Sequence, residues 1–169
     1  KKSRVFNINK AAGLINGVYV EPGGEFDMNA ALGARNAENG WKEATAIRDG
    51  AYTQEYGGGV CQVSSTLYNA VLMADLAVTE RHHHSWPLGY VDIGRDATIS
   101  TGGPNFKFSN NGGSGVTVGA FVDAKAKTVT VLIYGRPSAE WASIRLTSVK
   151  VESIADSGDK IELDASLPH

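Results

Sequence analysis

Apolar residues recur at helical spacing in the middle of the chain. Within residues 62–74 they fall at positions i, i+4, i+7, i+8 and i+11, which are Val63, Leu67, Ala70, Val71 and Ala74. Such spacing places the side chains on one stripe of an amphipathic helix. The pattern therefore predicts a helix from Gln62 to Ala74 with one buried face, and it indicates a shorter helical stretch from Asn9 to Ile15.

Alternation of apolar and polar residues predicts β-strands on both sides of this helix. Residues 17–29, GVYVEPGGEFDMN, indicate a strand, a Pro-Gly-Gly turn and a second extended piece. Residues 116–135 hold two β-rich runs around the polar DAKAK, which is the pattern of a hairpin. Residues 77–100 indicate short strands joined by turns, and residues 105–115 alternate before a turn.

Residues 33–59 are polar and interrupted by glycines, so the sequence predicts a long connection there. A short helix or strand is expected within residues 41–50, and connections of this length are often functional in a compact domain. The elements together predict an α+β fold. We expect the helix that follows Cys61 to pack on a mostly antiparallel sheet formed by the segments after Ala77, an arrangement like that of cysteine proteases and transglutaminases by analogy alone.

Length and composition suit one domain. A chain of 169 residues with 42% hydrophobic residues can build one core, and is too short for two full ones. Patterning weakens after Arg136 and Pro137. We therefore expect one domain over residues 1–137 and a linker or the start of a following module over 138–169, with one strand within 143–154.

Charge and hydropathy restrict the partners. The formal net charge is -2 and no block of like charge occurs, so neither nucleic acid nor anionic lipid is expected as a partner. No apolar stretch approaches the roughly 20 residues of a membrane span, and the first residues lack the apolar core of a signal peptide. The chain starts at a lysine, so an export signal or anchor upstream is compatible with the sequence. We expect a monomer without a cofactor.

The chain has a single cysteine, Cys61, which follows Gly57, Gly58 and Gly59 at the start of the predicted helix. A helix N-terminus lowers a thiol pKa because unpaired N–H groups and the dipole favour the thiolate. Glycines would also permit close approach of a substrate and leave N–H groups free for an oxyanion. A buried, inert cysteine is the alternative, and the residues alone weigh the two about equally.

A thiolate nucleophile needs a base and a group that orients it, and the segment RHHHS offers imidazoles. On a strand, His82 and His84 would share one face while His83 would point to the other. Asp96 could hold a ring N–H, which gives the order Cys61, His, Asp. The alternatives are a solvated histidine edge and a zinc site formed by the two histidines and the thiolate.

Further candidates surround these residues. The guanidinium of Arg95 suits a substrate carboxylate, although a salt bridge to Asp96 or a nearby acid is an equally good role for it. Arg81 should point away from the histidine face on alternation. Gln62, Ser64 and Ser65, with the three glycines, are the other candidate substrate-binding residues, and the two serines are expected to act mainly through local hydrogen bonds to the backbone.

Three motifs in this order, GGGVCQVSSTLYNAVLMADL, ERHHHSWPLGYV and GRDATI, closely resemble the VanW family of bacterial cell-envelope proteins. The resemblance continues upstream through NINKAAGLINGVYVEPGGEFDMN and downstream to VLIYG, and so covers residues 4–135. In that family the histidine motif is His-any-His-Ser, so His82 and His84 match its fixed positions. The family's usual FSFN is FDMN here, a departure at Asp27 and Met28 that affects no proposed catalytic residue.

The resemblance implies a domain of exported Gram-positive proteins, located in the cell wall or on the outer face of the membrane, that acts on peptidoglycan stem peptides. It further implies an L,D-transpeptidase that forms 3-3 cross-links through a cysteine thioester, with L,D-carboxypeptidase activity when water replaces the acceptor amine. Two alternatives stay open. One is a non-catalytic peptidoglycan-binding module, and the other is a zinc-dependent cell-wall peptidase.

Overall fold

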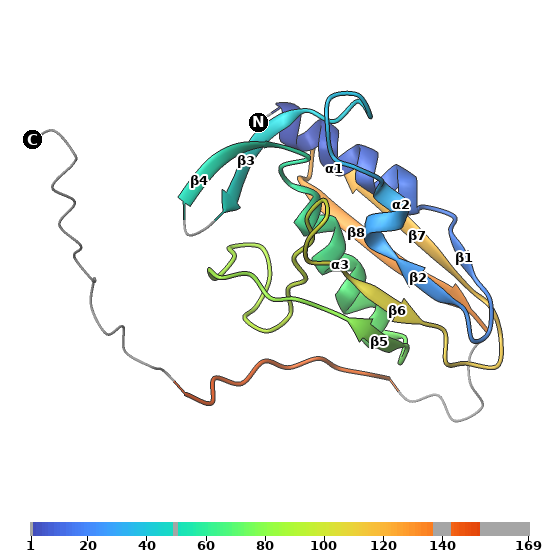
Figure 1. Ribbon diagram of the computed structural model, residues 1–169. Helices are drawn as coiled ribbons and strands as arrows, with labels where there is room; N and C mark the ends of the chain where they lie inside the picture. The colour runs from blue at the N-terminus through green and yellow to red at the C-terminus, as the bar shows by residue number, and fades with distance from the viewer. Residues whose placement is uncertain (1, 49–50, 137–142, 153–169) are drawn as a thin grey trace, which may run out of the picture.

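A computed structural model describes residues 2–48, 51–136 and 143–152, and the chain folds there as an α+β domain (Figure 1). In chain order its elements are α1 (Lys2–Ile15), β1 (Tyr19–Val20), β2 (Glu25–Asp27), α2 (Met28–Leu32), β3 (Glu43–Arg48), β4 (Ala51–Tyr56), α3 (Val60–Met73), β5 (Ala77–Glu80), β6 (Lys107–Ser109), β7 (Val116–Asp123) and β8 (Thr128–Gly135). None of the described helices is long and apolar enough to cross a membrane.

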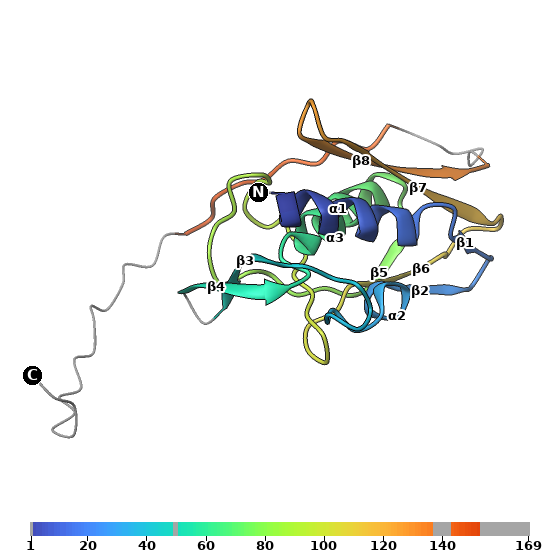
Figure 2. The same cartoon turned by 90° about the horizontal axis from the view of Figure 1, so that it is seen from above.

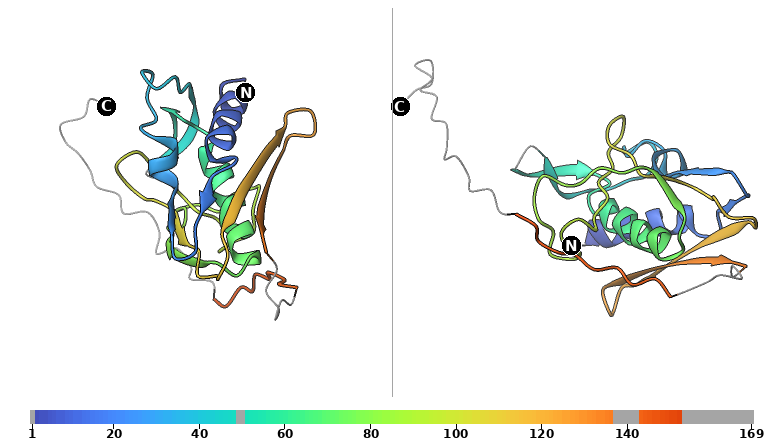
Figure 3. Two further views of the ribbon diagram at one scale, coloured as in Figure 1. Left: turned by 90° about the vertical axis from the view of Figure 1, so that its right-hand side faces the viewer. Right: turned by 90° about the horizontal axis from the view of Figure 1, so that it is seen from below.

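Helices α1 and α3 lie between two sheets, which Figure 2 shows from above and Figure 3 shows end-on. One sheet has the strand order β1-β7-β8 and the other has the order β2-β6-β5, and every strand pair in both is antiparallel. A separate hairpin of β3 and β4 lies beside the N-terminal end of α3. This order of layers leaves the helices buried on two sides.

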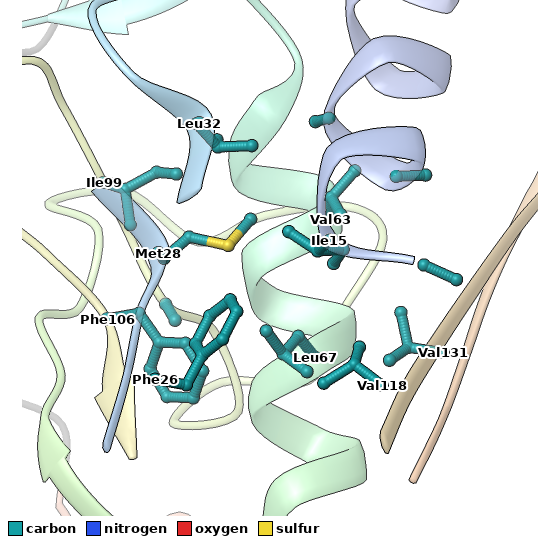
Figure 4. Close-up of a cluster of buried hydrophobic side chains, with 14 of the residues drawn as sticks. Ile15, Phe26, Met28, Leu32, Val63, Leu67, Ile99, Phe106, Val118 and Val131 are labelled. Atoms are coloured by element: carbon teal, nitrogen blue, oxygen red, sulfur yellow. The ribbon is translucent and has the colours of Figure 1, made fainter. Parts of the chain in front are cut away.

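The core fills the space between the two sheets, with α3 at its centre (Figure 4). Leu67 of α3 is fully buried between Phe106 on one side and Val118 of β7 on the other. The rings of Phe26 and Phe108 stack at a centroid distance of 5.1 Å, which joins β2 to β6. Because α3 contacts apolar side chains from both sheets, packing on two sides fixes the position of the helix. Cys61 in its first turn is fixed with it.

Several sequence predictions are confirmed. The helix expected over 62–74 spans Val60–Met73, the hairpin of 116–135 is β7 and β8, and β1 and β2 lie where residues 17–29 predicted two extended pieces. The N-terminal helix is longer than expected, because it begins at Lys2 rather than Asn9. Within 41–50 the chain forms strand β3, not a helix.

Other expectations need correction. The antiparallel strands form two three-stranded sheets rather than one sheet after Ala77, because the early strands β1 and β2 pair with β7 and β6. The connection of residues 33–59 contains the β3–β4 hairpin. Strand β5 ends at Glu80, so the histidine motif is not part of a strand. Residues 143–152 contain no strand. The other residues of the expected linker or module, 138–142 and 153–169, lie outside the described residues.

Candidate functional site

Cys61 lies in the first turn of α3 and is half-buried. The residue that caps the helix is Gly59, whose φ of 107° is in the left-handed region that favours glycine. Around this turn the described backbone bonds join Val60 N–H to Gly57 O and Gln62 N–H to Gly59 O, and none of them uses the N–H of Cys61. The sulfur therefore lies beside an N–H group at the positive end of the helix dipole.

The three glycines before Cys61 pack against other parts of the protein. A Cβ on Gly57 would lie 2.7 Å from Cγ of Arg35, and one on Gly59 would lie 2.8 Å from Cγ of Arg4. A Cβ on Gly58 would overlap the carbonyl group of Ala44. Gly57 and Gly58 are buried, so the expectation that the triplet leaves an open approach for substrate needs correction. The glycines instead let α3, β3 and α1 come close together.

Asn7 of α1, which sequence reasoning did not select, forms hydrogen bonds to the backbone of this glycine turn and of the residue before β3. Its side chain is fully buried. The Nδ2 group donates to Lys42 O at 2.8 Å and to Gly58 O at 3.1 Å, and Oδ1 accepts from Lys42 N–H at 3.0 Å. All polar atoms of the amide are thus satisfied, and the position of Cys61 depends on a residue 54 positions earlier. An asparagine on the apolar face of the first helix is the signal that could have pointed to it.

His84 is the histidine that approaches Cys61. Its Nδ1 lies 2.5 Å from Asp96 Oδ2, and its backbone N–H donates to the same oxygen at 2.6 Å. With Nδ1–H given to the carboxylate, Nε2 is the ring nitrogen left to face Cys61, and the two side chains are close enough for each to shift the pKa of the other. The side chains of His84 and Asp96 are only 13% and 11% exposed, so water screens the pair weakly.

Asp96 also binds an arginine. Arg81 donates from Nη2 to Asp96 Oδ1 at 2.8 Å and from Nε to Asp96 O at 2.7 Å. The prediction that Arg81 points away is therefore wrong, because residues 81–84 do not continue strand β5 and do not alternate as a strand would. Arg81, Asp96, His84 and Cys61 form one connected line of groups.

The pKa values along this line are displaced in a consistent way. Burial alone would raise the pKa of Cys61, but the hydrogen bond and positive charge of His84 outweigh it and the pKa is lowered. Burial would lower the pKa of His84, but the bonds to Cys61 and Asp96 raise it. The pKa of Asp96 is lowered despite burial by the N–H groups of His84 and the charge of Arg81. The arrangement favours a thiolate and imidazolium pair.

His82 is placed elsewhere. Its ring is exposed, with Nε2 3.1 Å from Glu80 Oε1, and only its backbone oxygen serves the site, by accepting from Thr98 N–H at 2.8 Å. The expected shared face of His82 and His84 is therefore wrong. These two rings and Cys61 do not converge, and within the described part of the chain no three His, Cys, Asp or Glu side chains are placed to hold a metal ion.

A segment from Ala97 to Ile99 covers the cysteine and is bound to α3. Ser64 Oγ donates to Ala97 O at 2.6 Å, and Ser65 Oγ accepts from Ala97 N–H at 2.9 Å. Both serines are buried, so their hydroxyl groups join α3 to the segment 97–99 and are not accessible to a substrate. The sulfur of Cys61 lies 3.5 Å from Ile99 O and 3.9 Å from the hydroxyl of Thr98 on this segment.

The remaining predicted residues lie around this centre. Arg95 Nε donates to Asn69 Oδ1 at 2.7 Å, and Nη1 lies 3.2 Å from Asp92 Oδ2. Asn69 follows Cys61 by eight residues, which is about 12 Å along a helix. Arg95 thus has the salt bridge to a nearby acid that was one of its two expected roles. Gln62 accepts from Arg4 at 3.3 Å through Oε1.

Two residues that the sequence did not single out lie close enough to affect Cys61. Arg35 is buried and donates to Gly33 O and Asn29 Oδ1. Burial lowers its pKa, and the charge of Cys61 acts against that change. Burial and the charge of Cys61 raise the pKa of Tyr90, so its phenol stays protonated and is able to donate a hydrogen bond. Both residues lie on loops, where no periodic pattern marks a position.

Comparison with known proteins identifies relatives. Residues 3–134 match the family model described as VanW like protein. The chain is 45% identical over 109 residues to YoaR of Bacillus subtilis, covering 64% of this chain and 36% of that protein. It is 30% identical over 116 residues to the vancomycin B-type resistance protein VanW of Enterococcus faecalis, covering 66% of this chain and 42% of that protein. The chain thus spans less than half of either relative, and no solved structure matches it significantly.

Proposed function

The chain belongs to the family of VanW-like proteins, and from this premise we propose that it is a cysteine-dependent acyltransferase, an L,D-transpeptidase that joins peptide stems of peptidoglycan in the cell envelope. One observation carries the proposal. Cys61, at the N-terminus of α3, and His84 shift each other's pKa toward the charged pair, and His84 is bound to Asp96 at 2.5 Å. A thiol, an imidazole and an orienting carboxylate in this relation are the groups that covalent acyl transfer needs.

Acylation is the first step of the proposed reaction. The thiolate of Cys61 attacks the carbonyl carbon of the third stem residue, and the carbonyl electron pair moves to oxygen. The N–H of Cys61, for which no backbone acceptor is described, and the protonated phenol of Tyr90 are the candidate donors to that oxyanion. When the C–N bond to the terminal D-alanine breaks, His84 gives its proton to the leaving amine, and a thioester remains on Cys61.

Deacylation reverses the proton movement. An amine from a neighbouring stem attacks the thioester, neutral His84 accepts a proton from the attacking nitrogen, and the C–S bond breaks to restore the thiolate. Water in place of the amine gives the free tripeptide stem, which is L,D-carboxypeptidase activity. Asp96 keeps Nδ1 protonated in both steps, so Nε2 is the atom that exchanges the proton. Arg81 keeps Asp96 ionised throughout.

The location of the reaction is part of the same proposal. One relative carries a name that refers to vancomycin resistance, and we propose that this chain acts on the wall outside the cell. An arrangement with a cysteine at a helix start and its base on a separate segment is also consistent with a cysteine-protease-like layout. The α+β class with antiparallel sheets supports that analogy in outline.

The test is a search for the acyl-enzyme. The protein is incubated with a disaccharide-tetrapeptide, and its intact mass is measured. The expected result is an adduct equal to the substrate less D-alanine, present in the parent protein and absent in Cys61→Ser and His84→Ala. Absence of an adduct together with substrate binding that survives alkylation of Cys61 would overturn the proposal in favour of a non-catalytic binding module.

A further inference from the structure

A cavity of about 370 Å³ has His84 in its wall. Every residue that lines it belongs to the segment 81–96, which in Figure 1 is the light green loop below the β3–β4 hairpin. His84 and Asp96 are among the lining residues, and Cys61 is not. We propose that this cavity is the subsite for the acyl acceptor, and that it takes a primary amine carried on an aliphatic chain. This inference rests on the proposed transpeptidase function.

The position of His84 is the first argument. An amine that attacks the thioester must transfer a proton to the imidazole, so its nitrogen must approach the ring. The donor peptide occupies the side of Cys61 in the acyl-enzyme, and its thioester carbonyl is held at the start of α3. The acceptor substrate therefore needs a separate path to His84 that the bound donor peptide does not block. The cavity offers such an approach for the chain that carries the amine, because its wall includes His84 and leaves Cys61 to the donor, and the terminal nitrogen would extend past His84 to the thioester carbon.

The walls suit an aliphatic chain. Trp86, Leu88, Val91 and Ile93 give most of the lining its apolar character. The ring of Trp86 also packs edge-on against the ring of Tyr52 of β4, at a centroid distance of 6.1 Å, and this contact helps to hold it in position. Contact with such walls removes methylene groups from water, which favours an amine on a carbon chain over a short polar one.

The charge at the cavity suits a cation. Asp92 lines it with a side chain that is 68% exposed, and only Oδ2 is engaged, at 3.2 Å from Arg95. The other carboxylate, Asp96, is neutralised by Arg81 and His84. Arg81 also lines the cavity, and its guanidinium donates hydrogen bonds to Asp96, so its charge is balanced by that carboxylate. Oδ1 of Asp92 therefore stays able to accept a hydrogen bond from an ammonium group in the cavity.

The acceptor step balances without a further reagent. The ammonium loses one proton to solvent, and the neutral amine adds to the thioester carbonyl. The C–N bond forms, the C–S bond breaks, and the second proton passes from nitrogen to Nε2 of His84. The products are the cross-linked amide and the thiolate and imidazolium pair with which the cycle began.

The experiment measures how the acyl-enzyme partitions. The protein is acylated with disaccharide-tetrapeptide in the presence of Nα-acetyl-L-lysine, and the ratio of amide product to hydrolysed tripeptide is measured by mass spectrometry. For Asp92→Asn we expect the ratio to fall by a factor on the order of 3 to 10 at limiting amine, with a weaker dependence on salt. The matched control is Asp75→Asn at the opposite end of α3, for which the ratio of the parent protein is expected.

A second variant tests the cavity itself. Val91→Trp fills the space between the apolar walls, and we expect it to lower the ratio at least tenfold for Nα-acetyl-L-lysine but not for methylamine, which needs no room for a chain. A ratio that neither variant changes would overturn the acceptor subsite while leaving the acyl-enzyme, and so the proposed function, in place. If the parent protein forms no acyl-enzyme at all, the proposed function itself fails.

Discussion

His84 Nδ1 lies 2.5 Å from Asp96 Oδ2, and the backbone N–H of the same histidine donates to the same oxygen at 2.6 Å. Two donors from one residue on one carboxylate oxygen determine both the orientation of the ring and the tautomer it takes. Arg81 binds the other oxygen, Oδ1. The base of the proposed reaction is therefore held by contacts that do not involve the substrate, and this organisation leads to measurable consequences.

Replacing Asp96 by Asn should reverse the hydrogen bond at His84. The amide presents either a weaker acceptor or a donor to Nδ1, so the proton moves toward Nε2 and the ring can no longer accept from the thiol. We expect the rate of acyl-enzyme formation to fall by a factor on the order of 10² to 10⁴, measured by rapid quenching and intact mass. Circular dichroism provides the control for folding. A rate within twofold of the parent protein would contradict the assignment.

The thiol of Cys61 should react at a pH below its ordinary range. The pKa is lowered by His84 against burial, so the rate of alkylation by iodoacetamide should reach its midpoint below about 8.5. In His84→Ala burial acts without that compensation, and the midpoint should move above about 8.5. His82→Ala is the matched control, because that ring is exposed and pairs with Glu80. Equal shifts in the two variants would argue against a Cys61 and His84 pair.

Stability should depend on pH through the same groups. The pKa of Asp96 is lowered, so its contribution is present above its unfolded value of about 3.9 and is lost as the pH falls through the folded value. The pKa of His84 is raised, so its contribution is complete below about 6.5 and is lost as the pH rises through the folded value.

The difference in melting temperature between the parent protein and His84→Asn should therefore be largest near pH 5, within this window, and smaller at pH 3 and at pH 9. Thermal unfolding followed by circular dichroism measures it. A difference that stays constant from pH 3 to pH 9 would show that the side chain of His84 stabilises the fold by packing alone, without its charge.

Gly58→Ala should destabilise the fold, because the added methyl group would overlap the backbone carbonyl of Ala44. Backbone cannot move aside as a flexible side chain does, so we expect a loss of roughly 1–3 kcal/mol in the free energy of unfolding. Gly13→Ala in α1 is the matched control, because nothing lies within 4 Å of the new Cβ. It should stabilise the protein by roughly 0.5–1 kcal/mol. Urea unfolding measures both, and a neutral Gly58→Ala would refute close packing at this turn.

Arg95→Met separates two roles of one arginine. Its bond to Asn69 connects α3 to the segment that carries Asp96, and its bond to Asp92 lies within that segment, so the loss of both should lower the melting temperature by a few degrees, the effect of about 1 kcal/mol. The KM for tetrapeptide should change by less than threefold on that account. A rise in KM on the order of tenfold or more with an unchanged melting temperature would instead assign Arg95 to the terminal carboxylate of the substrate.

Local patterning along the chain was enough to determine α3 and the β7–β8 hairpin. Each has the period of its own secondary structure, 3.6 residues in α3 and 2 in the strands, and each period is set by neighbours within a few residues. Sequence motifs were also enough to identify the VanW-like family and to select Cys61, His84 and Asp96 as candidates. Amino-acid sequence alone could predict this much because spacing and residue type carry the information.

Tertiary structure decided which groups meet. His82 and His84 are equivalent in the motif, and only the end of β5 at Glu80 and the return of the chain at Asp96 place one ring beside Cys61 and the other in solvent. Asn7 reaches Gly58 across 51 positions, and the cavity exists only because the segment 81–96 closes on itself. Such contacts join residues whose separation along the chain follows no period, so no local pattern contains them, and only burial and hydrogen bonding in the folded protein determine them.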